Sequence, residues 1–125
     1  MYQGSIVEVD LPTRDGFSKP RPAIVISETK ENQETGMFAC VLLSASSYHT
    51  NPRPKYFIVV PSHPDRLTST KLPEPTVAMC DHLFSEVPID SVIRKGGYAK
   101  AKIVERVLDA VKEYHDPDSS EADEE

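Results

Sequence analysis

Five short apolar runs, separated by turn-forming residues, mark the first 80 positions of the chain. The run at residues 6–11 alternates, with Val7, Val9 and Leu11 on one face and Ile6 with two acidic residues on the other. This period of two is typical of a half-buried strand. The other four runs are continuous and rich in β-branched or aromatic residues, which favours buried strands. They lie at residues 23–26, 38–43, 56–60 and 77–80.

A helical period replaces this pattern near the C-terminal end. Within residues 100–114, apolar side chains recur three or four positions apart and form one stripe. They are Ile103, Val104, Val107, Leu108 and Val111. The spacing predicts one amphipathic helix, and we expect Gly96-Gly97 to break the chain just before it.

The connections between the runs predict how the strands pair. The runs follow one another without a helical pattern between them, which favours antiparallel pairing over βαβ units. All eleven prolines fall outside the apolar runs or at their margins, so we expect them to delimit the strands. The pattern therefore predicts a mainly β fold, a small curled antiparallel sheet or barrel with a C-terminal helix packed across it.

Composition narrows the class of protein. The length of 125 residues suits one domain, and 38% hydrophobic with 27% charged residues is typical of a globular chain. No apolar run approaches the roughly 20 residues of a membrane helix, and the N-terminus does not resemble a signal peptide. Cys40 and Cys80 form no C-x-x-C motif, so we expect two buried free thiols. These features predict a cytoplasmic protein without a membrane partner.

The net charge of −6 is concentrated at the C-terminal end. Residues 116–125 carry six acidic residues and no basic one, which leaves 14 acidic residues to balance the 14 basic ones. We expect residues 1–115 to form the folded domain and residues 116–125 to be a disordered acidic tail. Because the body is neutral, a nucleic-acid site on it has to be local.

The most unusual local feature is the sequence Lys19-Pro20-Arg21-Pro22 at the entrance of the second run. Both prolines have a fixed φ, and each residue before a proline is pushed toward extended geometry. Arg21 is therefore held with little backbone freedom, which suits bidentate recognition of a phosphate. The alternative is an arginine paired with a surface acid beside a prolyl strand edge.

Four segments together resemble a known family. They are G-x-I-V-x-V-D-L-P-T at residues 4–13, R-P-A-I-V-I-S at residues 21–27, an apolar strand ending in a hydroxyl residue at 41–44, and V-x-x-C-D at 77–81. In this order and approximate spacing, closed by a C-terminal helix, they resemble the MazF/PemK/Kid family of toxin endoribonucleases over about residues 1–114. The resemblance implies the family's SH3-like barrel with a terminal helix, a fold shared with CcdB.

The resemblance also implies an activity and its residues. Members cleave single-stranded RNA without metal or cofactor, through attack of a 2′-hydroxyl on the neighbouring phosphodiester. The family's catalytic arginine and strand-end hydroxyl map to Arg21 and Ser44, and the aspartate of its C-D-Q motif maps to Asp81. His82 replaces the glutamine and can exchange protons near neutral pH. A cognate antitoxin and a second copy of the chain, forming a homodimer, are the implied partners.

Other residues suit an RNA-binding groove, because cations beside aromatic rings contact backbone phosphates and stack on bases. The predicted set is Arg14, Phe17, Lys19, His49, Arg53 and Lys55. The alternatives are ordinary: scattered solvated cations, a strand-end hydroxyl at Ser44, and structural roles for Asp81 and His82.

The chain also departs from the family pattern. The first loop lacks the usual E-Q…G sequence, and Phe84-Ser85 stands where members often have an R-T pair. Two further functions therefore stay open: a non-catalytic binding module on the same scaffold, and a gyrase-poisoning toxin of the CcdB type.

Overall fold

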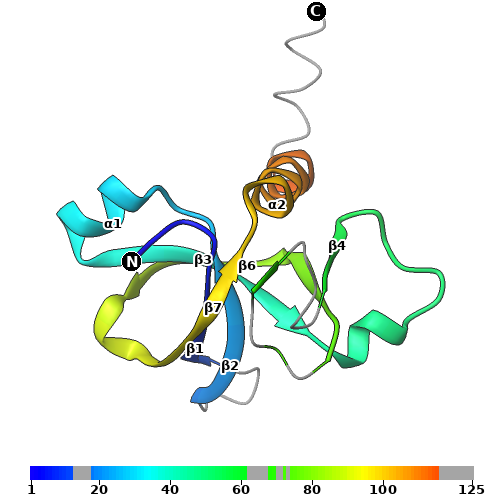
Figure 1. Cartoon of the computed structure of the whole chain (residues 1–125), viewed down its shortest axis with the longest axis horizontal. Coiled ribbons are helices and arrows are strands. Elements are labelled where there is room, and N and C mark those ends of the chain that lie inside the picture. The colour runs from blue at the N-terminus through cyan, green and yellow to red at the C-terminus, as the bar shows by residue number, and fades with distance from the viewer. Residues whose placement is uncertain (13–17, 62–67, 70–71, 73, 116–125) are drawn as a thin grey trace, which may run out of the picture.

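The computed structural model describes residues 1–12, 18–61, 68–69, 72 and 74–115. Within them the strands form one seven-stranded sheet in the order β4-β6-β3-β2-β1-β7-β5, and every described pair is antiparallel (Figure 1). The elements are β1 (Ser5–Pro12), β2 (Ser18–Val25), α1 (Thr29–Thr35), β3 (Met37–Ser44), η1 (Ser46–His49), β4 (Phe57–Val60), β5 (Thr68–Ser69), β6 (Thr76–Pro88), η2 (Ile89–Ser91), β7 (Val92–Ala99) and α2 (Ala101–His115).

The two faces of the curled sheet bury separate apolar clusters. The alternation in β1 sets this division, because Val7, Val9 and Leu11 enter one cluster and Ile6 enters the other. We call the first the barrel cluster; its buried members are Val7, Val9, Leu11, Ala23, Val25, Phe38, Cys40, Leu42, Val77, Met79 and Val87. The second lies under α2, whose Ile103, Val104 and Val107 pack on Ile6, Ile24, Val41 and Cys80. The predicted mainly β fold with an amphipathic C-terminal helix is confirmed.

Features of β7, α1 and β6 differ from the sequence-based expectations. Gly96 and Gly97 do not break the chain, because both lie inside β7. They fall where the pairing of β7 with β1 shifts register, between Ser5↔Tyr98 and Val7↔Lys95, and a bulge tolerates glycine. The short helix α1 and the long polar second half of β6 also lack the apolar runs by which the other elements were predicted.

Prolines do not delimit β2, since Pro20 and Pro22 lie within it. They pair with Asp10 and Glu8 of β1, but the pairing of β2 with β3 covers only Ala23–Val25. The N-terminal half of β2 is therefore an edge on its β3 side, where a residue without an N–H leaves no ladder bond unmade.

No helix in the described part of the chain is long and apolar enough to cross a membrane.

Gly4 is the position where the fold depends most clearly on a missing side chain. Its φ is +92°, and an added Cβ would lie 2.9 Å from Val104 Cγ2 and 3.3 Å from the Ala99 carbonyl oxygen. We expect Gly4→Ala to lower the free energy of unfolding by on the order of 2 kcal/mol in urea titrations followed by circular dichroism. Gly36→Ala is the matched control, because Gly36 also has a positive φ, +71°, but no atom within 4 Å of the added Cβ. Equal losses in the two variants would show that α2 does not pack closely on Gly4.

Candidate functional site

Strand register brings Arg21 and Ser44 to the same end of the sheet. Arg21 lies opposite Val9 of β1, and the last described pair between β2 and β3 is Ala23↔Leu42. Continuing that register by two residues sets Arg21 across from Ser44. Each lies two positions from a barrel-cluster residue, so both side chains share that face of the sheet. The two residues that the family resemblance selects therefore lie at the same end of the sheet, beyond the last β2–β3 pair.

The guanidinium group of Arg21 has an unused donor. Its Nε is buried and has no hydrogen-bond partner, although the side chain as a whole is only half-buried. No carboxylate in the described residues forms an ion pair with Arg21, so the alternative of a surface salt bridge finds no support there. A buried N–H without an acceptor is unfavourable by about 1–3 kcal/mol. Because Nε itself has almost no exposed surface, an anionic oxygen reaches it only when the half-exposed side chain turns outward, and a bond formed there would remove that penalty.

The hydroxyl of Ser44 is held by the turn that follows it. Ser44 ends β3 opposite Val77 of β6, and its Oγ accepts a hydrogen bond of 3.1 Å from the backbone N–H of Ser47. This bond caps η1, where the formal cap residue Ala45 has no side-chain hydrogen bond. Ser44 also donates to Ser47 Oγ at 3.0 Å, and its Oγ lies 3.2 Å from Ser46 Oγ. Ser44 thus presents a hydroxyl of fixed position at the end of the strand.

Asp81 and His82 lie farther along β6. They occupy a bulge, because Leu42 pairs with Met79 and the preceding Val41 pairs with Leu83. The bulge places Asp81 beside the Val41–Leu42 step of β3, two to three residues before Ser44, which is about 7–10 Å along a strand. His82 Nδ1 lies 2.8 Å from Asp81 Oδ1. The structure pairs these two residues with each other and does not bring them to Arg21 and Ser44.

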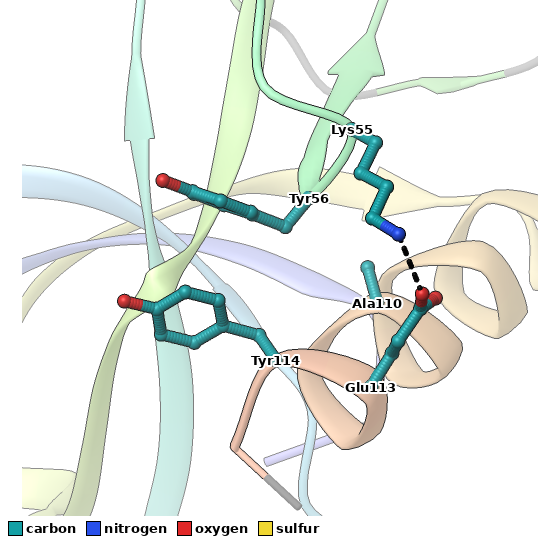
Figure 2. Close-up of a pocket in the computed structure, with 5 residues that line it drawn as sticks. All are labelled: Lys55, Tyr56, Ala110, Glu113 and Tyr114. Carbon is teal, nitrogen blue, oxygen red and sulfur yellow. Dashed lines mark ion pairs between the residues drawn. The ribbon is translucent and has the colours of Figure 1, made fainter. Parts of the chain in front are cut away.

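A pocket of about 350 Å³ lies between the two residues that precede β4 and the end of α2. Figure 2 shows the rings of Tyr56 and Tyr114 side by side, with centroids 4.6 Å apart and both hydroxyls directed to the same side. Burial and the negative charge of Asp81 raise the pKa of Tyr56 above its ordinary value, which places Asp81 near this pocket. Lys55 forms an ion pair of 3.1 Å with Glu113 of α2 on the opposite wall (Figure 2). Lys55 is therefore engaged on the helix side of the molecule.

The remaining predicted RNA-binding residues fall into two groups. Lys19 is exposed and lies two positions before Arg21 on the same face of β2. His49 and Arg53 lie on the connection after Ser44, where Arg53 Nη1 donates to the Tyr48 carbonyl at 2.8 Å and its guanidinium lies 5.2 Å from the Tyr48 ring centroid. Arg14 and Phe17 lie outside the described residues, as does the acidic segment 116–125.

Both cysteines are buried free thiols, as expected. Burial raises the pKa of Cys40 to about 12, and burial together with Asp81 raises the pKa of Cys80 to about 12. Both groups stay protonated through neutral and moderately alkaline pH, so neither supplies a thiolate nucleophile. We expect an aromatic disulfide reagent at pH 8 to modify neither thiol in the folded protein and both in urea. Rapid reaction of one thiol in the folded protein would contradict this.

Among the described residues, no group of three His, Cys, Asp or Glu is arranged to hold a metal ion.

Sequence reasoning missed Ser47 and Met79. Ser47 Oγ lies between Ser44, from which it accepts, and Met79 Sδ, to which it donates at 3.4 Å. The spacing Ser44-x-x-Ser47 is a usable signal, since a hydroxyl three residues before a turn's N–H is a common cap. Met79 gave no signal, because it belongs to an apolar run and reaches the site only through pairing of β6 with β3.

Comparison with known proteins identifies the family and the fold. Residues 2–115 match the family model described as PemK-like, MazF-like toxin of type II toxin–antitoxin system. The fold is similar to the Mycobacterium tuberculosis toxin MazF-mt6, with a TM-score of 0.66 and 18% identity over 90% of this chain and 96% of that one. MazF from Deinococcus radiodurans gives 0.69 and 18% over 91% and 94%. A mycobacterial endoribonuclease in complex with its cognate antitoxin gives 0.65 and 17% over 90% and 91%. None of the curated proteins matches the chain in sequence.

Proposed function

The chain belongs to the PemK-like, MazF-like toxins of type II toxin–antitoxin systems, and from this premise we propose that it is an endoribonuclease that cleaves single-stranded RNA at Arg21 and Ser44. The observation that carries the proposal is the buried, unpartnered Nε of Arg21, two residues beyond the last β2–β3 pair at the end of the sheet where Ser44 also lies. An RNA phosphate is the anion that would satisfy this donor in an endoribonuclease. The protein then acts in the cytoplasm, where its substrate is.

The proposed reaction needs no nucleophile from the protein. The 2′-oxygen forms a bond to phosphorus while the bond from phosphorus to the 5′-oxygen breaks. The products are a 2′,3′-cyclic phosphate and a 5′-hydroxyl. One proton leaves the 2′-hydroxyl and one is taken up by the 5′-oxygen. The extra negative charge gathers on the non-bridging oxygens, where the guanidinium of Arg21 and the hydroxyl of Ser44 stabilise it.

Other residues bind the strand on either side of the cleavage centre. Lys19, His49 and Arg53 contact the phosphates and bases nearest to Arg21 and Ser44. RNA binding by Arg14 and Phe17, which lie outside the described residues, stays part of the proposal. Asp81 keeps the role that the resemblance implies, in catalysis or RNA binding. His82, which replaces the family's glutamine and lies 2.8 Å from Asp81 Oδ1, can exchange protons there. Lys55 binds RNA only if the RNA displaces Glu113 from its ion pair with Lys55. That exposed ion pair is a weak contact.

The test is cleavage of a mixed-sequence single-stranded RNA by the purified chain, with the ends of the products identified. We expect fragments with a 2′,3′-cyclic phosphate and a 5′-hydroxyl, formed equally well in EDTA. If the folded chain cuts no RNA but binds it, the protein is a binding module on the toxin scaffold. Inhibition of gyrase-dependent supercoiling without RNA cleavage would instead support an activity of the CcdB type.

The hydroxyl of Ser44 supplies a smaller share of the rate than Arg21. Ser44→Ala removes one hydrogen bond to the developing charge, so we expect kcat to fall about tenfold. The same change removes the cap of η1, so the rate has to be compared at equal folded fraction. Ser44→Thr keeps the hydroxyl and should stay within about threefold of the parent. Equal activities of the alanine variant and the parent would remove Ser44 from the site.

Two partners follow from the family. We propose that a cognate antitoxin inhibits the chain by covering the surface around Arg21, so that antitoxin and RNA compete. We also propose that the chain is a homodimer with the RNA groove along its interface. Sedimentation that gives a stable 13.9 kDa species at micromolar concentration would contradict the dimer.

A further inference from the structure

The hydroxyl of Ser44 has no free hydrogen-bonding capacity in the structure. A serine hydroxyl has one donor and two acceptor lone pairs. The donor of Ser44 is used by Ser47 Oγ at 3.0 Å. One lone pair accepts the Ser47 N–H at 3.1 Å, and Ser46 Oγ lies 3.2 Å away at the other. For Ser44 to donate to a phosphate oxygen, its O–H has to turn away from Ser47.

The position of Ser47 lowers the free-energy cost of rotating the Ser44 O–H. Its own hydroxyl donates to Met79 Sδ at 3.4 Å, and a thioether sulfur is a weak acceptor. When the Ser44 O–H leaves, the Ser47 O–H is free to rotate from the sulfur to Ser44 Oγ, 3.0 Å away. The two hydroxyls then reverse their direction of donation. Ser44 Oγ accepts from Ser47 in place of Ser46, whose exposed hydroxyl turns to solvent. A hydroxyl that accepts a hydrogen bond is also a stronger donor in its own.

From this arrangement we propose that Ser47 is a positioning residue for RNA cleavage: it holds the Ser44 hydroxyl by its backbone N–H and releases the Ser44 proton toward the scissile phosphate by reversing its own hydroxyl. The proposal rests on the proposed ribonuclease function. It adds a residue that touches no substrate and acts through Ser44. Met79, buried in the barrel cluster beneath, supplies the acceptor that makes the reversal possible.

The first experiment separates kcat from KM. Ser47→Ala keeps the backbone N–H that caps η1 but removes the hydroxyl, so we expect kcat to fall about tenfold while KM for RNA stays within twofold. Binding of an RNA with a 2′-deoxy nucleotide at the cleavage position should be unchanged. Ser47→Thr should restore kcat. Ser91→Ala is the matched control, because Ser91 is also a serine of a 3-10 helix, bonded to the Pro88 carbonyl at 2.6 Å; it should behave as the parent.

The second experiment asks whether Ser47 acts through Ser44. In a Ser44→Ala background, adding Ser47→Ala should change kcat by less than twofold, because the group that Ser47 positions is already gone. A further tenfold loss would show an independent structural role and overturn the proposal, as would an unchanged kcat in the single variant. If the parent cuts RNA and Arg21→Ala does not, but Ser47→Ala is fully active, the proposed function stands and this inference fails. If the parent cuts no RNA, the proposed function fails first and the inference falls with it.

Discussion

Arg21→Ala is expected to lower kcat/KM for RNA cleavage about a hundredfold, equivalent to on the order of 3 kcal/mol of transition-state stabilisation. The backbone of Arg21 is held by two flanking prolines and by pairing with Val9, so little backbone freedom is lost when the guanidinium binds the phosphate. The variant should fold, because the side chain is half-buried and the strand ladder uses backbone atoms. Removal of the unpartnered Nε should leave the free energy of unfolding unchanged or raise it slightly.

Two further variants make the Arg21 result specific. Arg21→Lys keeps the charge but loses the planar fork, so we expect it to recover less than a tenth of the parent rate. Arg106→Ala removes the same charge from the exposed face of α2 and should keep at least half of the parent rate. Rates are measured by single-turnover cleavage of a labelled RNA at equal folded concentration. If Arg21→Ala cuts as fast as the parent, the cleavage centre has been placed wrongly.

The elements that burial dictates were the ones open to prediction from the sequence. Period-two alternation in β1 and the apolar stripe of α2 are direct consequences of facing a core, and both are confirmed. The second half of β6 and most of β7 face solvent on at least one side, so their polar residues carried no such signal. Gly96-Gly97 was misinterpreted for a related reason, since a bulge in a strand and a break before a helix favour the same residue.

Part of the candidate site could also be predicted from the sequence, and part of it could not. The family resemblance selects Arg21 and Ser44, and strand register explains why residues 23 positions apart lie at the same end of the sheet. Asp81 and His82 belong to the next family motif after the strand that ends in Ser44. A bulge in β6 and the length of that strand nevertheless place them near Tyr56. No rule based on residue spacing reports where a bulge lies, because the extra residues depend on packing against β3 and β4. The link from Ser44 through Ser47 to Met79 joins a turn to a strand more than 30 residues later, which only the fold reveals.

Asn32 shows the same limit in the core. It lies in the short helix α1, yet its side chain is fully buried and joins three segments. Asn32 Nδ2 donates to the carbonyls of Met1 at 3.0 Å and Ser27 at 3.2 Å, while Ser27 Oγ donates to Asn32 Oδ1. Ser27 Oγ in turn accepts the N–H of Ala39 in β3 at 2.8 Å. These bonds tie the N-terminus to the connection between β2 and β3, the two strands that carry Arg21 and Ser44.

Asn32→Asp is accordingly expected to lower the free energy of unfolding by about 3–5 kcal/mol at pH 7. The change keeps the shape of the side chain but replaces the donor that faces two carbonyl oxygens with a buried negative charge. Protonation of the new carboxyl restores a donor and removes the charge, so the loss should be smaller at pH 4 than at pH 7. Gln33→Glu makes the same change in charge on the exposed neighbouring residue and should shift the free energy by less than about 0.5 kcal/mol. Urea unfolding at the two pH values measures both variants, and a loss for Asn32→Asp as small as that of Gln33→Glu would show that the Asn32 network does not stabilise the fold.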